Sequence, residues 1–254
     1  GIDPPRRTIS AGGEELAYYS LVVTLGSTTP MASIPGLAEH GHRIDTVDHA
    51  TLFRDAIARH TGPHLRVTVV GGGLTGIELA TELASEPATS VTLVDAGQVG
   101  QGFGPAGEAV VRDALARLGV TIVEDARVEA VLPGGVATSH GAIDHDLLVW
   151  CGGLRASGLT ELIGGTRDPL GRLEVDRELR VSGVTGVWAA GDVARTLPDG
   201  AHIAPMSCQF AIPSGQAAGH NAAAHLLGGE GLPFEVARYV TCVDLGAAGA
   251  MFTT

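Results

Sequence analysis

The stretch that decides the fold is Val67-Thr68-Val69-Val70-Gly71-Gly72-Gly73-Leu74-Thr75-Gly76-Ile77-Glu78, an apolar strand that runs through a glycine turn into a helix. It fits the pattern GxGxxG at Gly71, Gly73 and Gly76. In that pattern the first glycine allows a tight turn, the second lets the backbone approach a pyrophosphate, and the third lets the helix pack on the strand. The helix that begins near Thr75 would direct its unpaired N–H groups and its dipole toward the phosphates.

The sequence that follows this turn predicts a βαβ unit. The strand over 66–70 leads into a helix with Ile77 and Ala80 on one face, and then into a second strand over 91–94. Asp95 ends the second strand, at about the spacing where the pattern expects an acid that binds the adenosine ribose. We therefore favour dinucleotide binding over a βαβ turn without a ligand. No arginine lies between Asp95 and Arg112, so the sequence indicates NADH rather than NADPH.

The composition is that of a globular protein that does not bind nucleic acid. With 254 residues, 44% of them hydrophobic, the chain can form one large or two medium-sized domains with apolar cores. Its formal net charge of -12 leaves no basic surface for a nucleic-acid backbone. The 16 residues counted as Lys or Arg are all arginine, which excludes a Schiff-base lysine and a P-loop lysine in this chain.

The cysteine and histidine patterns predict neither a disulfide framework nor a metal site. Cys151, Cys208 and Cys242 are scattered and form no CxxC, which favours a reducing compartment and a cytoplasmic location. Cys151 ends an apolar strand, and we expect it to be a small core residue rather than a nucleophile. The 10 histidines include no HExxH and no cluster at ligand spacing.

The remaining apolar patterns place the βαβ unit in an α/β protein. Asp48 is expected to cap a helix that turns Leu52 and Phe53 inward, and Pro213 is expected to begin a helix of small residues. Val110 is expected on the inner face of another helix. The other predicted elements are a hairpin over 8–18, a buried strand over 21–25, a helix over 106–118, and short strands over 120–124, 128–132, 136–139 and 147–150. A βαβαβ core followed by a small meander and one more parallel strand predicts a Rossmann-like domain of three layers: a parallel sheet, a β-meander and helices.

Four motifs in this order resemble those of one family. They are Gly71-Gly72-Gly73-Leu74-Thr75-Gly76-Ile77-Glu78-Leu79-Ala80, Leu148-Val149-Trp150-Cys151-Gly152-Gly153, Gly186-Val187-Trp188-Ala189-Ala190-Gly191-Asp192 and Val22-Val23-Thr24-Leu25-Gly26-Ser27. Together they resemble the two-dinucleotide-binding flavoproteins of the pyridine nucleotide-disulfide oxidoreductase superfamily, and within them the type II NADH dehydrogenase-like branch. The resemblance covers essentially the whole chain.

The resemblance implies two cofactors, FAD and NAD(H), and assigns residues to each. Asp192 would hold the ribityl chain of FAD, and Glu78 would lie near the nicotinamide ribose, although it is equally well explained as an acid in the first turn of a helix. The residues implied for NAD(H) are Gly71, Gly73, Leu74, Thr75, Gly76, Glu78, Asp95 and Gly153. Those implied for the flavin side are Thr24, Gly26, Gly191, Asp192, Gln209 and Ala211. Since the cofactors carry the chemistry, no catalytic side chain is assigned.

The chain departs from the family pattern in two places. Members begin with their own FAD-binding GxGxxG strand, and none precedes Gly1, so we expect the 254-residue chain to hold no FAD at full occupancy. Cys208-Gln209-Phe210-Ala211-Ile212-Pro213 lies where the type II enzymes carry an AQxAxQ quinone motif. Gln209 and Ala211 fit that motif, whereas Pro213 replaces its second glutamine.

These observations predict four segments and one function. The segments are a partial FAD-binding domain over 1–61, an NAD(H)-binding domain over 62–168, a return segment of the FAD domain over 169–235, and the start of a truncated C-terminal region over 236–254. The predicted function is FAD-dependent oxidation of NADH with electron transfer to an acceptor such as a quinone. The alternatives are a soluble reductase for ferredoxin or another acceptor, and a non-catalytic NAD-sensing protein. The resemblance also allows a homodimer and peripheral association of the full-length protein with the cytoplasmic face of a membrane.

Overall fold

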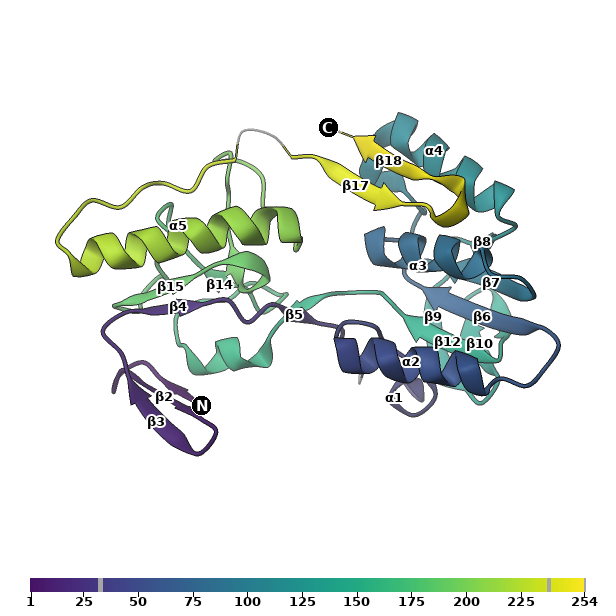
Figure 1. Ribbon diagram of the computed structural model, residues 1–254, viewed down its shortest axis with the longest axis horizontal. Helices are drawn as coiled ribbons and strands as arrows, with labels where there is room; N and C mark the ends of the chain where they lie inside the picture. The colour runs from purple at the N-terminus through teal and green to yellow at the C-terminus, as the bar shows by residue number, and fades with distance from the viewer. Residues whose placement is uncertain (32–33, 237–238, 254) are drawn as a thin grey trace. The chain divides into compact units, whose positions relative to one another are not determined.

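The computed structural model describes residues 1–31, 34–236 and 239–253, and its contacts divide the chain into two units (Figure 1). Unit 1 contains Gly1–Thr28 and Leu154–Tyr239, and unit 2 contains Thr29–Gly153 and Val240–Thr254. Each unit is therefore assembled from two separate stretches of the chain.

Unit 2 is built on a parallel sheet in which the strands follow the order β12-β6-β7-β8. Five of the six residues of β6 are buried, as expected for a strand covered on both faces. The helix α3 connects β6 to β7, and the two strands pair in parallel, so the predicted βαβ unit is confirmed. The bounds are Leu65–Val70 for β6, Leu74–Ala84 for α3, Thr89–Val94 for β7, Thr121–Val123 for β8 and Leu147–Trp150 for β12.

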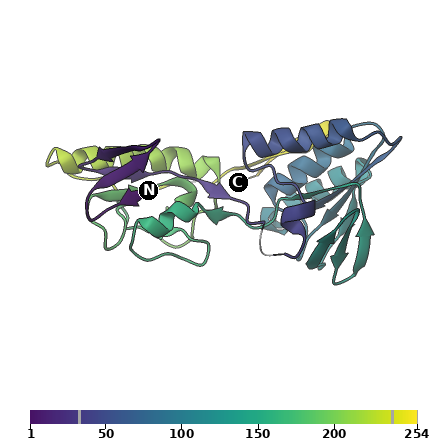
Figure 2. The ribbon, with the colours of Figure 1, turned by 90° about the horizontal axis from the view of Figure 1, so that it is seen from below.

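The sheet of unit 2 lies between a layer of helices and a layer of antiparallel strands (Figure 2). On one face, Ile77 of α3 and Val111 of α4 are fully buried against the sheet. On the other face, Val136 of β10 packs against Val70 and Val94. The three layers predicted from the sequence are therefore confirmed. The further elements are α1 (Leu37–His40), α2 (Val47–Arg59), η1 (Gln101–Phe103), α4 (Gly104–Arg117), β9 (Val128–Leu132), β10 (Gly135–Thr138) and β11 (Gly141–Asp144).

Two predicted helices differ from the observed ones at their starts and on their inner faces. Thr46, not Asp48, caps α2, because its side chain accepts a hydrogen bond from the backbone N–H of His49. Leu52 is 57% exposed, so Phe53 alone of the expected pair is buried. Val110 of α4 is likewise 45% exposed. Apolar residues at the border of a helical face can remain at the surface, because the stripe that the core covers is narrower than the apolar pattern.

The division by contacts differs from the expected boundaries at 61 and 168. Residues 29–61 belong to unit 2, because Leu37 and Phe53 are buried in its two cores. Residues 154–168 belong to unit 1, because Ala156 and Ile163 are buried with Val187. The Gly-Pro at 62–63 is thus a turn between α2 and β6 rather than a domain boundary.

The sequence predicted the start of a truncated C-terminal region over 236–254, and in the structure residues 241–253 form a hairpin that belongs to unit 2. The hairpin consists of β17 (Thr241–Asp244) and β18 (Ala250–Thr253), joined by η4 (Gly246–Ala248). Val243, Leu245 and Met251 are buried in the same core as Ile77 of α3. The cause of the difference is therefore apolar burial against the helical layer. Residues 237, 238 and 254 of the predicted region lie outside the described residues.

Unit 1 contains small sheets and one long helix. The strand β15 pairs in parallel with β4, and α5 packs against both. The predicted hairpin over 8–18 is present as β2 and β3. The bounds are β1 (Ile2–Asp3), β2 (Thr8–Ala11), β3 (Glu14–Ala17), β4 (Leu21–Val23), β5 (Ser27–Thr28), β13 (Arg155–Ala156), η2 (Gly158–Leu162), β14 (Leu173–Glu174), β15 (Val187–Ala189), η3 (Gly191–Val193), β16 (Ala194–Arg195) and α5 (Cys208–Leu226).

The helix α5 begins five residues before the predicted start at Pro213. Its N-cap is Ser207, and Pro213 lies inside the helix. A proline inside a helix removes one backbone donor, which leaves a carbonyl of the preceding turn without its N–H partner. The hydroxyl of the next residue, Ser214, donates to a different carbonyl, that of Phe210, at 2.6 Å.

Candidate functional site

The three glycines of the GxGxxG stretch occupy three different environments. Gly71 has φ +112°, and a Cβ there would lie 2.8 Å from the backbone nitrogen of Gly152. A Cβ on Gly76 would lie 1.7 Å from the carbonyl oxygen of Gly71. A Cβ on Gly73 would meet no atom within 4 Å. The first glycine is thus required by the turn and the third by close packing, whereas the space beside the second is open to a ligand.

The N-terminus of α3 follows directly from this turn. Its N-cap is Gly73, which provides no side-chain cap for the first N–H groups of the helix. Leu74 is partly buried against the core, and Thr75 is exposed in the first turn. Because the first N–H groups of a helix have no partner within it, this end can accept an anionic group such as a pyrophosphate.

Asp95 lies beside the glycine turn and is held by two backbone donors. One carboxylate oxygen accepts from the N–H of Gly72 at 2.5 Å, and the other accepts from the N–H of Gly97 at 2.7 Å. A carboxylate can accept about four hydrogen bonds, so about two acceptor positions remain for ribose hydroxyls. The two backbone N–H groups thus hold the Asp95 carboxylate in place and leave some of its hydrogen-bond acceptor positions free.

A crevice of about 360 Å³ opens at the carboxyl edge of β6, β7 and β12. Three residues predicted from the sequence line it: Gly71, Asp95 and Gly153. Ligands of open parallel sheets bind at this edge, so the geometry fits the adenosine part of a dinucleotide. Val70, Trp150 and Gly152 of the quoted motifs also line the crevice. The other lining residues are ones to which the sequence assigned no role, namely Pro30, Ile34, Val94, Ala96, Ala126, Arg127 and Val128.

Arg127 is the charged residue that the sequence interpretation missed. It follows β8, the neighbour of β7 in the sheet, and the adjacent Ala126 donates its N–H to the carbonyl of Asp95 at 2.9 Å. The segment between Asp95 and Arg112, which follows β7 directly, contains no arginine, whereas Arg127 follows the neighbouring strand. The predicted order of the parallel strands could have indicated Arg127, because the carboxyl ends of neighbouring parallel strands lie at the same edge of a sheet.

Gly153, Gly152 and Trp150, which follow or end β12, form another wall of the crevice. Gly153 has φ +71°, and the indole N–H of Trp150 donates to the carbonyl of Gly152 at 2.7 Å. Burial raises the pKa of the Cys151 thiol to about 12, so the thiol stays protonated at neutral pH. This agrees with the expectation that Cys151 is a core residue.

Glu78 has a structural contact and is not among the residues that line the crevice. Its carboxylate accepts a hydrogen bond from the N–H of Asp244 at 3.1 Å, which links α3 to β17. The reading of Glu78 as an acid near the nicotinamide ribose stays a prediction.

The flavin-side residues lie in unit 1, around the end of β15. The Ser27 hydroxyl donates to the Asp192 carboxylate at 2.6 Å, and the N–H of Gly191 donates to the Ser214 hydroxyl at 3.0 Å. Gly191 has φ +68°, and a Cβ there would lie 3.3 Å from the Cβ of Ala211. The start of α5 is thus held close to the Gly-Asp turn, and Asp192 keeps acceptor capacity for the hydroxyls of a polyol.

The remaining flavin-side candidates are less constrained. Thr24 is exposed at the end of β4, and Gln209 is half-buried in the first turn of α5. Gly26 has φ +67°, and its carbonyl accepts from the N–H of Ser157 at 3.0 Å. The roles of these three residues toward a flavin stay predictions.

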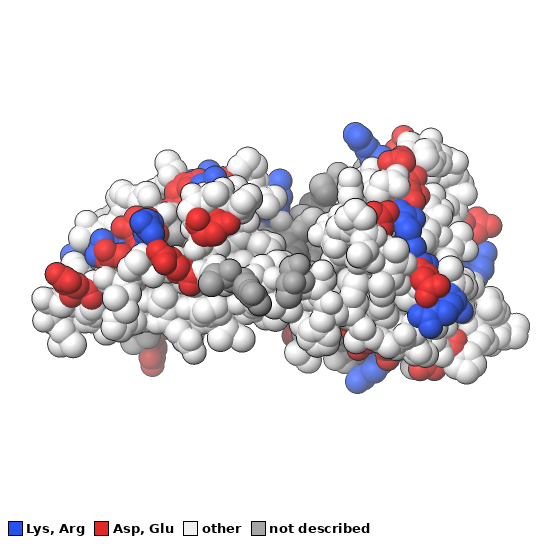
Figure 3. All heavy atoms as spheres, turned by 90° about the horizontal axis from the view of Figure 1, so that it is seen from above, with Lys and Arg blue, Asp and Glu red and all other residues white. Residues whose placement is uncertain are grey.

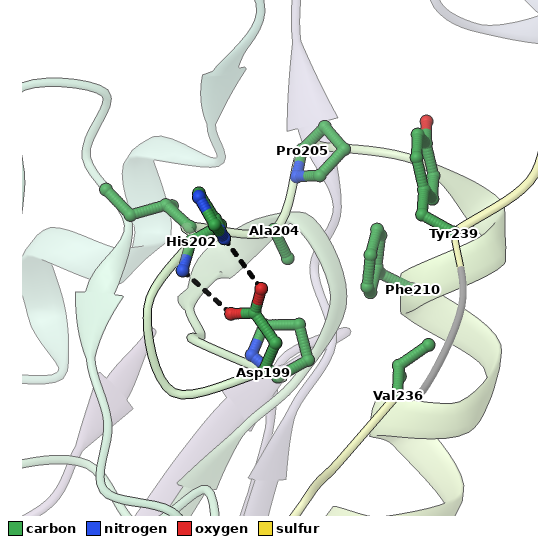
Figure 4. Close-up of a pocket in the computed structure, with 9 residues that line it drawn as sticks. Asp199, His202, Ala204, Pro205, Phe210, Val236 and Tyr239 are labelled. Atoms are coloured by element: carbon green, nitrogen blue, oxygen red, sulfur yellow. Dashed lines mark hydrogen bonds and ion pairs between the residues drawn. The ribbon is translucent and has the colours of Figure 1, made fainter. Parts of the chain in front are cut away.

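A second cavity, of about 300 Å³, lies beside α5 in unit 1 (Figure 4). The rings of Phe210 and Tyr239 stack with centroids 5.1 Å apart, and Asp199 lies 2.7 Å from Nδ1 of His202. Hydrogen bonds from His202 and Ala201 lower the pKa of Asp199. Of the segment 208–213, only Phe210 lines this cavity.

Charged side chains of both signs lie on the surface of the described residues. On the face in Figure 3, arginine and carboxylate side chains are interspersed, which is the pattern of ion pairs rather than of a phosphate-binding stripe. Within the described ranges, no group of three or more His, Cys, Asp or Glu residues is arranged to hold a metal ion. None of the described helices is both long and apolar enough to cross a bilayer.

Comparison with known families matches most of the chain. Residues 1–215 match the family described as pyridine nucleotide-disulphide oxidoreductase. The NADH dehydrogenase-like protein Rv1812c of Mycobacterium tuberculosis is 40% identical over 265 residues, covering 98% of this chain and 66% of that protein. The demethylphylloquinone reductase NdbB of Synechocystis is 25% identical over 252 residues, covering 95% of this chain and 62% of that protein. The chain thus spans just under two thirds of these relatives.

A solved structure supports the same relationship. The FAD-dependent pyridine nucleotide-disulphide oxidoreductase of Desulfovibrio vulgaris has a TM-score of 0.76 and 25% sequence identity, covering 95% of this chain and 63% of that one. Its match extends over both units, so both belong to one known architecture.

Proposed function

Because the chain belongs to the pyridine nucleotide-disulphide oxidoreductase family, we propose that it acts in an FAD-dependent NADH dehydrogenase. In such a protein a bound FAD would supply the redox chemistry that links oxidation of NADH to reduction of an acceptor. Unit 2 binds the nucleotide, and unit 1 binds the ribityl part of the flavin. The names of the M. tuberculosis and Synechocystis relatives support this assignment, since both describe reductases or dehydrogenases.

One observation carries the nucleotide part of the proposal: the open space beside Gly73, next to the uncapped N-terminus of α3. A structural turn has no need for a glycine at a position where a side chain would meet nothing and φ is −80°. The close approach of a pyrophosphate to the backbone explains why residue 73 is a glycine. Asp95 lies at the same turn, with acceptor capacity left for a ribose.

The residues of this chain bind and orient, and they do not act as acids or nucleophiles. The N-terminus of α3 stabilises the pyrophosphate charge, and Asp95 accepts hydrogen bonds from the adenosine ribose. Trp150 and Gly153 form one wall of the crevice. In unit 1, Ser27 orients the Asp192 carboxylate through their 2.6 Å hydrogen bond, so that its free acceptor positions can receive polyol hydroxyls.

The proposal is tested on the full-length protein. We expect the purified protein to show a flavin absorption spectrum, and we expect anaerobic NADH to bleach it. Oxygen or ferricyanide should then restore the spectrum. A full-length protein that binds NADH but carries no flavin would instead support the NAD-sensing alternative.

The acceptor is the finer part of the proposal, and Pro213 argues against efficient reduction of quinone. A proline has no side-chain amide to bind a quinone carbonyl, and it lies inside α5 where the resemblance places the second glutamine. We expect the full-length enzyme to reduce a short-chain quinone at least about tenfold more slowly than ferricyanide, the scale for losing one hydrogen bond.

Steady-state rates with both acceptors at saturating NADH check this expectation. Pro213→Gln is the matched variant, and it should raise the quinone rate without changing the ferricyanide rate. Comparable rates in the unsubstituted enzyme would show that Pro213 does not limit quinone reduction.

A further inference from the structure

The crevice that contains Asp95 is also lined by a positively charged residue, Arg127. Arg127 is exposed. Its side chain takes part in none of the ion pairs or side-chain hydrogen bonds of the described residues. The nearby Arg112, in contrast, is bound to Glu108 at 2.9 Å and to Glu124 at 2.5 Å. Of these two arginines, only Arg127 has a guanidinium available to a ligand in the crevice.

The backbone holds Arg127 at this position. Its N–H donates to the Ser139 hydroxyl at 3.1 Å, and its carbonyl accepts from the N–H of Ser139 at 2.9 Å. On its other side, Ala126 is hydrogen-bonded to the carbonyl of Asp95. Arg127 is therefore attached on one side to the meander and on the other to the strand end that carries the acid. This anchoring fixes where the side chain leaves the backbone, so its guanidinium stays within reach of the crevice.

We propose that Arg127 is a second determinant of nucleotide specificity, which binds the 2′-phosphate of NADPH and limits the discrimination that Asp95 imposes. The inference rests on the proposed binding of NADH in unit 2. Asp95 accepts hydrogen bonds from the ribose hydroxyls and repels a 2′-phosphate, whereas an arginine attracts that phosphate and can bind it in bidentate geometry. At the adenosine end of the crevice, Asp95 thus favours NADH and Arg127 favours NADPH. The bound Arg112 cannot take this role without breaking its contacts with both glutamates.

The test compares the affinities of four proteins for NADH and NADPH by calorimetric titration. The variants are Arg127→Gln, Arg127→Lys and the control Arg117→Gln, which makes the same charge change on α4, where Arg117 pairs with Asp113. Arg127→Gln should weaken NADPH binding about tenfold and change NADH binding less than about threefold, because a charge-assisted hydrogen bond to the phosphate is lost. Arg127→Lys should retain part of the NADPH affinity, and Arg117→Gln should retain all of it. The effect of Arg127→Gln should shrink at high salt, because an exposed charge pair is screened.

A pair of smaller probes isolates the phosphate. Adenosine 2′,5′-bisphosphate should lose affinity for Arg127→Gln, and 5′-AMP should not. An equal loss for both probes would overturn the proposal, since it would place the guanidinium on the adenine ring instead. Unchanged affinities for all ligands would also overturn it. If the unsubstituted protein bound neither NADH nor 5′-AMP, the proposed nucleotide site itself would be wrong, which distinguishes the two failures.

Discussion

Gly76→Ala is expected to destabilise unit 2 by about 3 kcal/mol or more, whereas Gly73→Ala is expected to leave its stability within about 1 kcal/mol. At Gly76 the new Cβ would lie 1.7 Å from the Gly71 carbonyl oxygen, which belongs to the backbone of a tight turn and cannot move aside. At Gly73 the new methyl group would meet no atom within 4 Å, and φ of −80° suits any residue. Thermal unfolding of the 254-residue chain, followed by circular dichroism, measures both effects.

The same two variants distinguish a glycine that the packing of the fold requires from a glycine that NADH binding requires. Gly73→Ala should fold normally and yet bind NADH about tenfold more weakly or worse, because its methyl group occupies the space that the pyrophosphate needs. Gly215→Ala is a control for a general effect of the substitution, since a Cβ at Gly215 in α5 also meets nothing. If Gly73→Ala bound NADH as tightly as the unsubstituted chain, the backbone at Gly73 would not lie against the ligand.

Asp95→Ala is expected to weaken NADH binding by about 1 to 3 kcal/mol, the scale for losing charge-assisted hydrogen bonds to the ribose. NADPH binding should stay unchanged or improve, because the like charge beside the 2′-phosphate is removed. Under the proposal for Arg127, the improvement should disappear in the Asp95→Ala and Arg127→Gln double variant. The unsubstituted chain should bind NADH more tightly than NADPH.

Titration with both nucleotides checks these expectations, and it requires the whole chain. A fragment that ended at Gly153 would lack the hairpin β17–β18, in which Val243 and Met251 complete the core around α3. Asp113→Ala on α4 is the matched control for the loss of one acid, since Asp113 pairs with Arg117 on that helix. An NADH affinity that is unchanged in Asp95→Ala would show that Asp95 does not face the ribose.

Local sequence was sufficient for the βαβ unit and its turn. The strand over 66–70, the glycines and the apolar face of α3 are periodic features of neighbouring residues, so they do not depend on the rest of the fold. The same is true of Asp95, because it lies at a fixed distance along a single βαβ unit. The start of α2 was predicted two residues too late, because a cap depends on a single hydrogen bond and Thr46 makes the bond that had been expected of Asp48.

The sequence by itself determined the fold class, the glycine turn and the acid beside it, because these follow from short-range patterns of residue type. Only the tertiary structure decided which distant residues complete the crevice and which segments complete the core. Arg127 lines the same crevice as Asp95 because β8 lies beside β7. The C-terminal hairpin joins unit 2 because Val243, Leu245 and Met251 are buried there. Both depend on apolar burial and strand order among segments far apart in the chain, and no local pattern encodes that pairing.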